Sequence, residues 1–273
     1  MIYTMPTSPA IDRGIACEAA AAAGARVMST AALVSLLVLS GLVVLTVGPG
    51  CHTAVSTGHG SGSDGTSRAR SSSLTPGDAI AYYESGAYLH DITEIATRAK
   101  AWIDLRAGQP RRAGERLVLV LDVDDTALSN FPGLREVDFQ WSNGDTGGGN
   151  AVGNAARDAW RQRASAPVIA PILDLFHFAL ARKVEVVFIS ERTDPDLREA
   201  TERNLRAAGY VGYTKLVMRP ARFAALDTSL WKADARRELV FEGGKIIAAI
   251  GDQPEDTEGP FIERAFRLPA LPP

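Results

Sequence analysis

The sequence predicts an α/β protein in which a parallel sheet carries helices on both faces. Four short apolar runs, rich in β-branched residues or Leu, alternate with stretches that can form helices. The runs are LVLVLDV at residues 117–123, VEVVFIS at 184–190, KLVMR at 215–219 and KIIAAIGD at 245–252. Strands and helices that alternate in this way form parallel sheets whose two faces are buried.

Helices are predicted before and between these runs. Residues 77–108 place apolar side chains at helical spacing and predict one or two opening helices. Further helices are predicted at 169–182, 195–208 and 230–242, and glycines at the ends of the last two act as helix stops.

Polar residues follow the apolar runs. Ligands of such sheets bind beyond the carboxyl ends of the strands. The polar residues are Asp122, Asp124 and Thr126 after the first run, Ser190 after the second, and Asp252 and Asp256 after the last. We therefore expect one acidic crevice at this edge of the sheet.

The N-terminal quarter has a different composition. Residues 31–47, AALVSLLVLSGLVVLTV, are almost continuously apolar and, with their uncharged flanks, long enough to cross a bilayer. We predict a cytoplasmic or n-region at 1–26, a signal peptide or transmembrane anchor at 27–50, a flexible Ser/Gly linker at 51–76 and a folded domain at 77–273. Cys51, after VGPG, resembles a bacterial lipoprotein cleavage site. Each alternative exports the folded domain.

Charge and cysteine content exclude several classes of protein. The 29 Lys and Arg against 32 Asp and Glu give a net charge of −3, without the basic excess of a nucleic-acid-binding protein. Both cysteines, Cys17 and Cys51, precede the folded domain, so this domain has neither a disulfide framework nor a cysteine zinc site.

Three acidic residues lie close together in the motif DVDDT at residues 122–126, and two simple explanations for them can be tested on the sequence. A calcium loop of the EF-hand type would need Gly at its sixth and Glu at its twelfth position, where this sequence has Ala127 and Gly133. An ordinary acidic turn accounts for any single Asp but not for the polar residues that follow the other runs.

Four motifs carry a family resemblance. LVLVLDVDDTALSN, VVFISER, WKADARRELV and IIAAIGDQPEDTEG resemble, in order and spacing, the four motifs of the haloacid dehalogenase (HAD) superfamily, and within it the acid phosphatases of subfamily IIIB. The resemblance implies a HAD-like Rossmannoid sheet with a cap insertion, here at about residues 129–166.

The resemblance also implies roles for the acidic residues. Asp122 would be the nucleophile that forms an aspartyl-phosphate, and Asp124 the general acid and then base. Mg²⁺ would bind the side chains of Asp122 and Asp252 and the backbone carbonyl of Asp124, while Asp256 would orient a metal-bound water.

Ser190, Lys232 and Thr126 would bind the phosphoryl group. Ser190 is alternatively an N-cap, and Thr126 a turn cap. Arg236, one turn after Lys232, is expected to be a surface or supporting cation.

Glu191 departs from the family pattern, since many relatives have Gly there, and Arg192 is the cation expected to offset its charge. Trp141 and Trp160, in the insertion, are expected to pack, with stacking on an aromatic leaving group as the alternative.

Together these features predict an exported, membrane-tethered, Mg²⁺-dependent phosphomonoesterase. The resemblance suggests 5'-nucleotides as substrates. The alternative is a non-catalytic surface or storage protein that uses the same fold for binding. A chain beginning at Ser73 is expected to be soluble and active, because the preceding tract adds nothing to the core.

Overall fold

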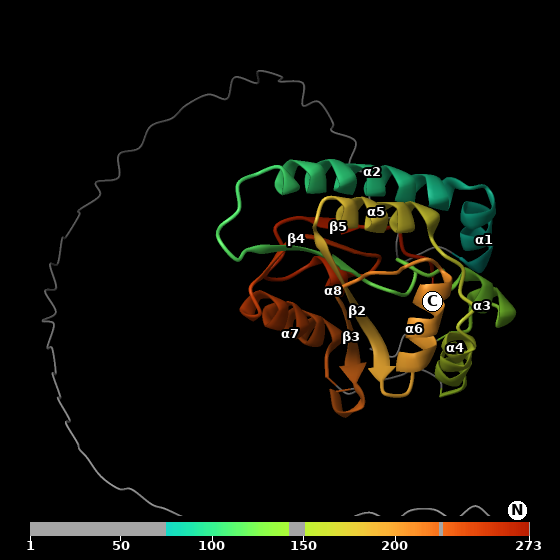
Figure 1. Ribbon diagram of the computed structural model, residues 1–273. Helices are drawn as coiled ribbons and strands as arrows, with labels where there is room; N and C mark the ends of the chain where they lie inside the picture. Colours follow the sequence, from blue (N-terminus) through green and yellow to red (C-terminus); the bar gives the residue numbers. More distant parts are fainter. Residues whose placement is uncertain (1–74, 142–150, 224–225, 273) are drawn as a thin grey trace, which may run out of the picture. The chain divides into compact units, whose positions relative to one another are not determined.

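The computed structural model describes residues 75–141, 151–223 and 226–272 (Figure 1). The predicted signal or membrane segment at 27–50, Cys51 and nearly all of the linker lie outside these ranges. Within them, no helix is both long enough and apolar enough to cross a membrane.

Five parallel strands form one sheet, and four of them correspond to the four apolar runs. They are β1 (Arg116–Leu121), β2 (Glu185–Asp194), β3 (Lys215–Pro220), β4 (Gly244–Gly251) and β5 (Ala265–Arg267). Their order across the sheet is β3-β2-β1-β4-β5, and all neighbouring strands are parallel. The short edge strand β5 was not predicted, because three residues are too few to give a periodic signal.

Helices cover both faces of the sheet (Figure 1). On one face, α2 (Ala87–Ala107) and α5 (Ala170–Ala181) pack against a core that includes Leu119 of β1; on the other, α7 (Thr228–Phe241) packs against a core that includes Val120. Successive residues of a strand point to opposite faces, so an unbroken apolar run is what a sheet buried on both sides requires.

Two helices open the domain. Helix α1 (Pro76–Glu84) begins after Thr75, whose side chain accepts from the backbone of Asp78 while the Asp78 carboxylate accepts from Thr75, forming a capping box. Gly86, at φ 81°, separates α1 from α2, and glycine adopts this left-handed conformation without strain.

The segment after β2 differs from the prediction. Ser190 does not end the strand, because after an irregularity in register Thr193 and Asp194 pair with β3. Helix α6 (Arg198–Ala207) therefore begins later than residue 195, and its N-cap is Leu197. The N-cap alternative for Ser190 is wrong.

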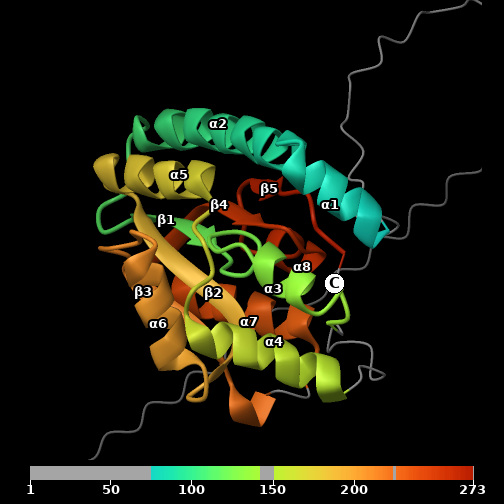
Figure 2. The same cartoon turned by 90° about the vertical axis from the view of Figure 1, so that its right-hand side faces the viewer.

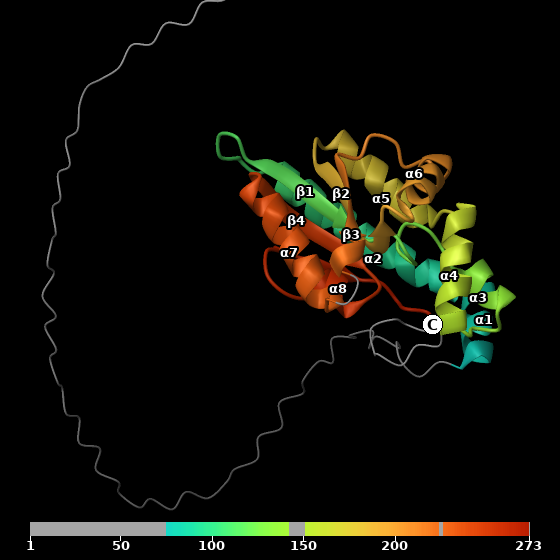
Figure 3. The same cartoon turned by 90° about the horizontal axis from the view of Figure 1, so that it is seen from below.

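The interval predicted as a cap contains α3 (Phe131–Glu136) and α4 (Ala151–Arg163). These helices face the viewer in Figure 2 and, with α1, lie at one end of the molecule in Figure 3. The short helix α8 (Pro254–Thr257) follows β4, and the 3-10 turn η2 (Ala221–Phe223) follows β3.

Candidate active site

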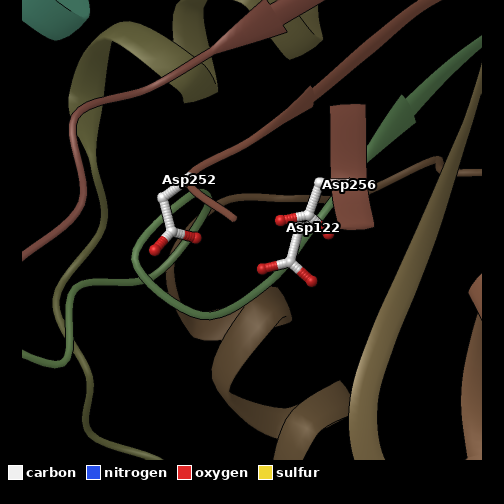
Figure 4. A group of neighbouring side chains, drawn as sticks. All are labelled: Asp122, Asp252 and Asp256. Carbon is white, nitrogen blue, oxygen red and sulfur yellow. The ribbon is translucent and has the colours of Figure 1, made fainter. Parts of the chain in front are cut away.

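Three buried carboxylates meet beyond the ends of β1 and β4. Asp122 follows β1, Asp252 follows β4, and Asp256 belongs to α8. One oxygen from each lies within 4.8 Å of the others. Figure 4 shows the three side chains side by side. The sequence therefore predicted this cluster correctly, since parallel strands bring their carboxyl ends to one edge.

Lys232 reaches this cluster from α7. Its Nζ donates to Oδ1 of Asp122 at 2.9 Å and also to Oδ1 of Asp256. The side chain is buried, which lowers the pKa of the ammonium group, but the charges of Asp122 and Asp256 outweigh burial and raise that pKa well above its ordinary value. Lys232 is therefore a fixed positive charge beside Asp122 rather than a solvated surface lysine.

One lysine does not neutralise three carboxylates. Burial and then mutual repulsion raise the pKa of both Asp122 and Asp252 well above the usual range. A divalent cation would remove this repulsion, and carboxylate oxygens are the ligands that Mg²⁺ prefers. The donor set therefore fits a hard divalent metal.

Asp256 already uses both of its oxygens. Oδ1 accepts from Lys232, and Oδ2 accepts from the backbone N of Gln253 at 3.0 Å. Gly251 stands so close to Asp256 that a Cβ there would overlap the Asp256 side chain. These contacts hold Asp256 in place. They fit the predicted role, in which Asp256 orients a metal-bound water, better than direct binding of the metal.

Asp124 lies in a different environment from Asp122. Arg192 donates to both of its carboxylate oxygens, at 2.8 and 3.0 Å, and Nδ2 of Asn130 donates at 2.9 Å. A terminal nitrogen of Arg161 lies 2.9 Å from Oδ2. Burial alone would raise the pKa of Asp124, but the two arginines outweigh it and hold that pKa far below its usual range. The carboxylate is thus ionised and tightly held.

Asn130 also holds the loop that carries Asp124. Asp125, at φ 52°, accepts from the backbone N of Asn130 at 2.8 Å and from its Nδ2 at 3.2 Å. Nε1 of Trp160 donates to Oδ1 of Asn130 at 3.1 Å. Burial raises the pKa of Asp125 to about 6. The side-chain amide of Asn130 therefore connects the DVDDT motif to helix α4, in addition to the contact between Arg161 and Asp124.

Glu191 pairs with Arg161 and not with Arg192. A terminal nitrogen of Arg161 donates to Oε1 of Glu191 at 2.9 Å, whereas the guanidinium of Arg192 binds Asp124 and Thr201. Arg192 was expected to offset Glu191 because it is adjacent in sequence. That expectation is wrong, because the guanidinium of Arg192 is bonded to Asp124 and Thr201, while Arg161 of α4 is the cation bonded to Glu191.

A cavity of about 340 Å³ opens over these groups. Its polar lining includes Asp122, Asp124, Lys232, Asp252, Arg161 and Glu191, and its apolar lining includes Leu134, Trp141, Leu271 and Pro272. The cavity is large enough for a phosphorylated small molecule.

Ser190 and Thr126 are fully buried and do not line this cavity. Oγ of Ser190 accepts from the backbone N of Arg192 at 3.3 Å. Oγ1 of Thr126 makes no hydrogen bond to any described residue, so it does not cap the turn. Their roles toward a phosphoryl group stay predictions.

Arg236 is buried rather than at the surface. Its two terminal nitrogens donate to the carbonyl oxygens of Glu255 and Glu258, at 2.9 and 2.8 Å. Of the two expectations for Arg236, a surface cation or a supporting cation, the second is therefore correct. Arg236 connects α7 to the segment that carries Asp256.

Both tryptophans of the insertion are buried. Trp160 stands on α4 outside the cavity lining, with its indole nitrogen bonded to Asn130. Trp141 lines the cavity, although only 7% of it is exposed. Packing is thus the main role of both, as expected.

Sequence reasoning missed Arg161 and Asn130. Arg161 lies in a polar helix with many charged residues, so nothing in the local pattern distinguishes it. Asn130 ends the quoted motif LVLVLDVDDTALSN, and an amide after a strand-end turn is a usual loop-stabilising residue. That signal was available.

Comparison with known proteins places this geometry in a family. The profile of the HAD superfamily, subfamily IIIB (Acid phosphatase), matches residues 73–270. The chain belongs to this family. The match covers the strands and the acidic cluster, and it confirms the resemblance carried by the four sequence motifs.

One solved structure and one curated protein are similar to this chain. The class C acid phosphatase from Bacillus anthracis shares the fold, with a TM-score of 0.52 and 23% identity over 67% of this chain and 71% of that chain. Acid phosphatase 1 of Solanum lycopersicum is 28% identical over 155 residues, or 56% of this chain and 57% of the relative.

Two further relatives have other names. Stem 28 kDa glycoprotein of Glycine max is 28% identical over 55% of this chain and 57% of its own length. Vegetative storage protein 1 of Arabidopsis thaliana is 31% identical over 56% of this chain and 53% of its own length. The chain thus spans little more than half the length of the curated relatives it matches.

Proposed function

We propose that this protein is a phosphomonoesterase, an acid phosphatase that works through an aspartyl-phosphate. The observation that carries the proposal is the position of Lys232, whose Nζ contacts both Asp122 and Asp256 beside Asp252 at the floor of the cavity. Membership of the acid-phosphatase family supports the same reaction.

Asp122 would attack phosphorus. One of its carboxylate oxygens forms a bond to phosphorus as the bond from phosphorus to the alcohol oxygen breaks, and the alcohol leaves with a proton. Water then attacks the aspartyl-phosphate and releases inorganic phosphate and Asp122. A carboxylate approaches a phosphate dianion only where positive charge offsets the repulsion, and Lys232 provides part of that charge.

Mg²⁺ would be held by the Asp122 and Asp252 side chains and by the backbone carbonyl of Asp124, with Asp256 in support. When bound, the ion supplies Lewis-acid stabilisation of the phosphoryl oxygens. The buried carboxylate cluster supports this assignment, because its charge exceeds that of Lys232.

Asp124 would transfer protons to the leaving alcohol and from the attacking water. Its four contacts to Arg192, Arg161 and Asn130 stabilise the ionised form. Proton donation therefore requires that these contacts loosen when the leaving group binds.

Export and a nucleotide substrate also belong to the proposal. Export is supported by the apolar run at residues 31–47, and nucleotides by the resemblance to acid phosphatases. Trp141, Leu134 and Leu271 give the cavity apolar walls for a leaving group.

The second candidate is a non-catalytic storage protein, which the names of the Glycine max and Arabidopsis thaliana relatives raise. The presence of Asp122, Asp124, Lys232 and Asp252 favours the enzyme. Hydrolysis of p-nitrophenyl phosphate, with and without EDTA, tests the choice. We expect turnover that EDTA abolishes and added Mg²⁺ restores.

The matched variant is Asp122→Asn, which keeps the volume but replaces the nucleophile with an amide. We expect loss of turnover with an unchanged circular dichroism spectrum. Turnover close to that of the unmodified protein in purified Asp122→Asn would refute the aspartyl-phosphate, and no turnover in either protein would favour storage.

A further inference from the structure

Arg161 joins the insertion to two acidic side chains of the site. One of its terminal nitrogens lies 2.9 Å from Oδ2 of Asp124 and 2.9 Å from Oε1 of Glu191. Only 5% of the Arg161 side chain is exposed. A buried cation shared by two carboxylates, one from the loop after β1 and one from β2, fixes the position of α4 against both.

The contact between Arg161 and Glu191 affects the charge of the cavity. It lines the same cavity as Asp122 and Lys232, and a carboxylate there repels an incoming phosphate dianion. Burial disfavours its charge, but Arg161 and Arg157 outweigh burial and hold the pKa of Glu191 below its usual value. Glu191 is therefore charged in the site, and Arg161 is the cation bonded to it.

Two other nearby cations, Arg192 and Lys232, are already engaged. Arg192 donates to both oxygens of Asp124 and to Oγ1 of Thr201, and Lys232 donates to Asp122 and Asp256. If Arg161 were lost, Glu191 would lose its hydrogen-bonded partner, and Asp124 would keep Arg192 and Asn130.

We propose that Arg161 is a positioning residue of the phosphatase site, which neutralises Glu191 so that the cavity accepts a phosphate dianion and which holds Asp124 in place from α4. This inference rests on the proposed function. It assigns to Arg161 two separable effects, one on anion binding through Glu191 and one on turnover through Asp124.

Inorganic phosphate is the probe for the first effect. Titration calorimetry in the presence of Mg²⁺ measures its Kd for Arg161→Met, Glu191→Gln and the double variant. We expect Arg161→Met to weaken phosphate binding by about tenfold or more, because Glu191 loses Arg161, the larger of the two arginine charges that offset its own. Glu191→Gln alone should bind phosphate at least as tightly as the unmodified protein.

The double variant decides between charge and shape. With both charges removed, we expect the phosphate Kd to return to within about threefold of its original value, since the repulsive carboxylate is gone. A double variant that binds phosphate no better than Arg161→Met would overturn the proposal, as would normal phosphate binding by Arg161→Met.

The second effect is read from kinetics with p-nitrophenyl phosphate. In the double variant KM should recover while kcat stays low, because Asp124 still lacks its contact to Arg161. If Arg161→Met does not fold, Glu191→Gln still tests the repulsion through the phosphate Kd, and the double variant still tests the contact to Asp124 through kcat. Recovery of kcat together with KM would remove Asp124 from the inference.

A matched control is the exposed pair of Arg182 and Asp104, 2.7 Å apart at the opposite end of the sheet. Arg182→Met should change neither phosphate Kd nor KM. If no protein in the series hydrolyses p-nitrophenyl phosphate, the proposed function fails, while the phosphate Kd values still test the role of Arg161.

Discussion

Nζ of Lys232 on α7 lies 2.9 Å from Oδ1 of Asp122 at the end of β1, and both side chains are buried. These residues are 110 positions apart in sequence, so the contact links the two halves of the domain. Removal of one partner from a buried ion pair leaves a charge that neither water nor protein stabilises.

Lys232→Met should therefore destabilise the domain as well as inactivate it. We expect a loss of about 3–5 kcal/mol in the free energy of unfolding by urea, because Asp122 and Asp256 lose their shared cation. Lys215→Met is the control, since Lys215 is exposed and its 2.8 Å pair with Glu242 is worth about 0–1 kcal/mol. Equal stability of the two variants would show that Lys232 is not a structural counter-charge.

Gly133 tests the packing of the insertion. A Cβ at this position would lie 2.5 Å from Cδ2 of Trp160 and 2.8 Å from Cζ2 of Trp141. We expect Gly133→Ala to cost about 1–3 kcal/mol through overpacking, measured by thermal unfolding. Gly108→Ala is the matched control, because its Cβ would meet nothing closer than 3.5 Å and its φ is −78°. If Gly133→Ala unfolds like Gly108→Ala, the indoles are not held as described.

The pH dependence of stability should include a contribution from Glu263. Its carboxylate accepts from Arg106 at 2.7 and 3.0 Å and lies 2.8 Å from Lys245. Burial acts to raise the pKa of Glu263, but Arg106 and Lys245 outweigh it and lower that pKa below the ordinary value. Because the folded state holds the proton more weakly, this stabilisation is complete above the ordinary pKa and is lost as pH falls through the lowered one.

Thermal unfolding of Glu263→Gln across pH measures that contribution. We expect the variant to be less stable by about 1 kcal/mol near neutral pH, with the difference shrinking below about pH 4. A difference that is constant across pH would mean that Glu263 contributes packing rather than charge.

The sequence could predict the sheet and the acidic cluster because both depend on local patterns. Apolar runs identify β1 to β4, and parallel strands bring Asp122 and Asp252 to the same edge without further information. Strand β5 and helix α8 are too short to carry a periodic signal.

Contacts between distant segments could not be predicted. Glu191 and Arg192 are neighbours in sequence, yet they bind different partners, Arg161 and Asp124, which come from distant parts of the chain. Arg161 reaches Asp124 from a helix 37 residues later, and no pattern within α4 shows which of its arginines faces inward. The position of a side chain on a helix depends on what the helix packs against.

The side chains of Asp124 and Asp252 should differ in their effect on Mg²⁺ binding. Asp252→Asn should raise the Mg²⁺ concentration needed for half-maximal activity, because an amide oxygen carries less charge than a carboxylate. Asp124→Asn should leave that concentration nearly unchanged, since only its backbone carbonyl would touch the ion. Titration of activity with Mg²⁺ compares the two variants, and a similar shift in both would make Asp124 a side-chain ligand.

The defect of Asp124→Asn should depend instead on the leaving group. A poor leaving alcohol needs a proton in the transition state, whereas p-nitrophenolate needs little, and assistance by a general acid is worth about 10²–10⁴-fold. We therefore expect a larger loss with an alkyl phosphate than with p-nitrophenyl phosphate, measured as the single-turnover rate of phosphorylation. The contacts from Arg192 and Arg161 favour the ionised form of the Asp124 carboxylate, which opposes its role as a proton donor. Equal losses on both substrates would mean that Asp124 orients its arginines and the loop, and that another group protonates the leaving alcohol.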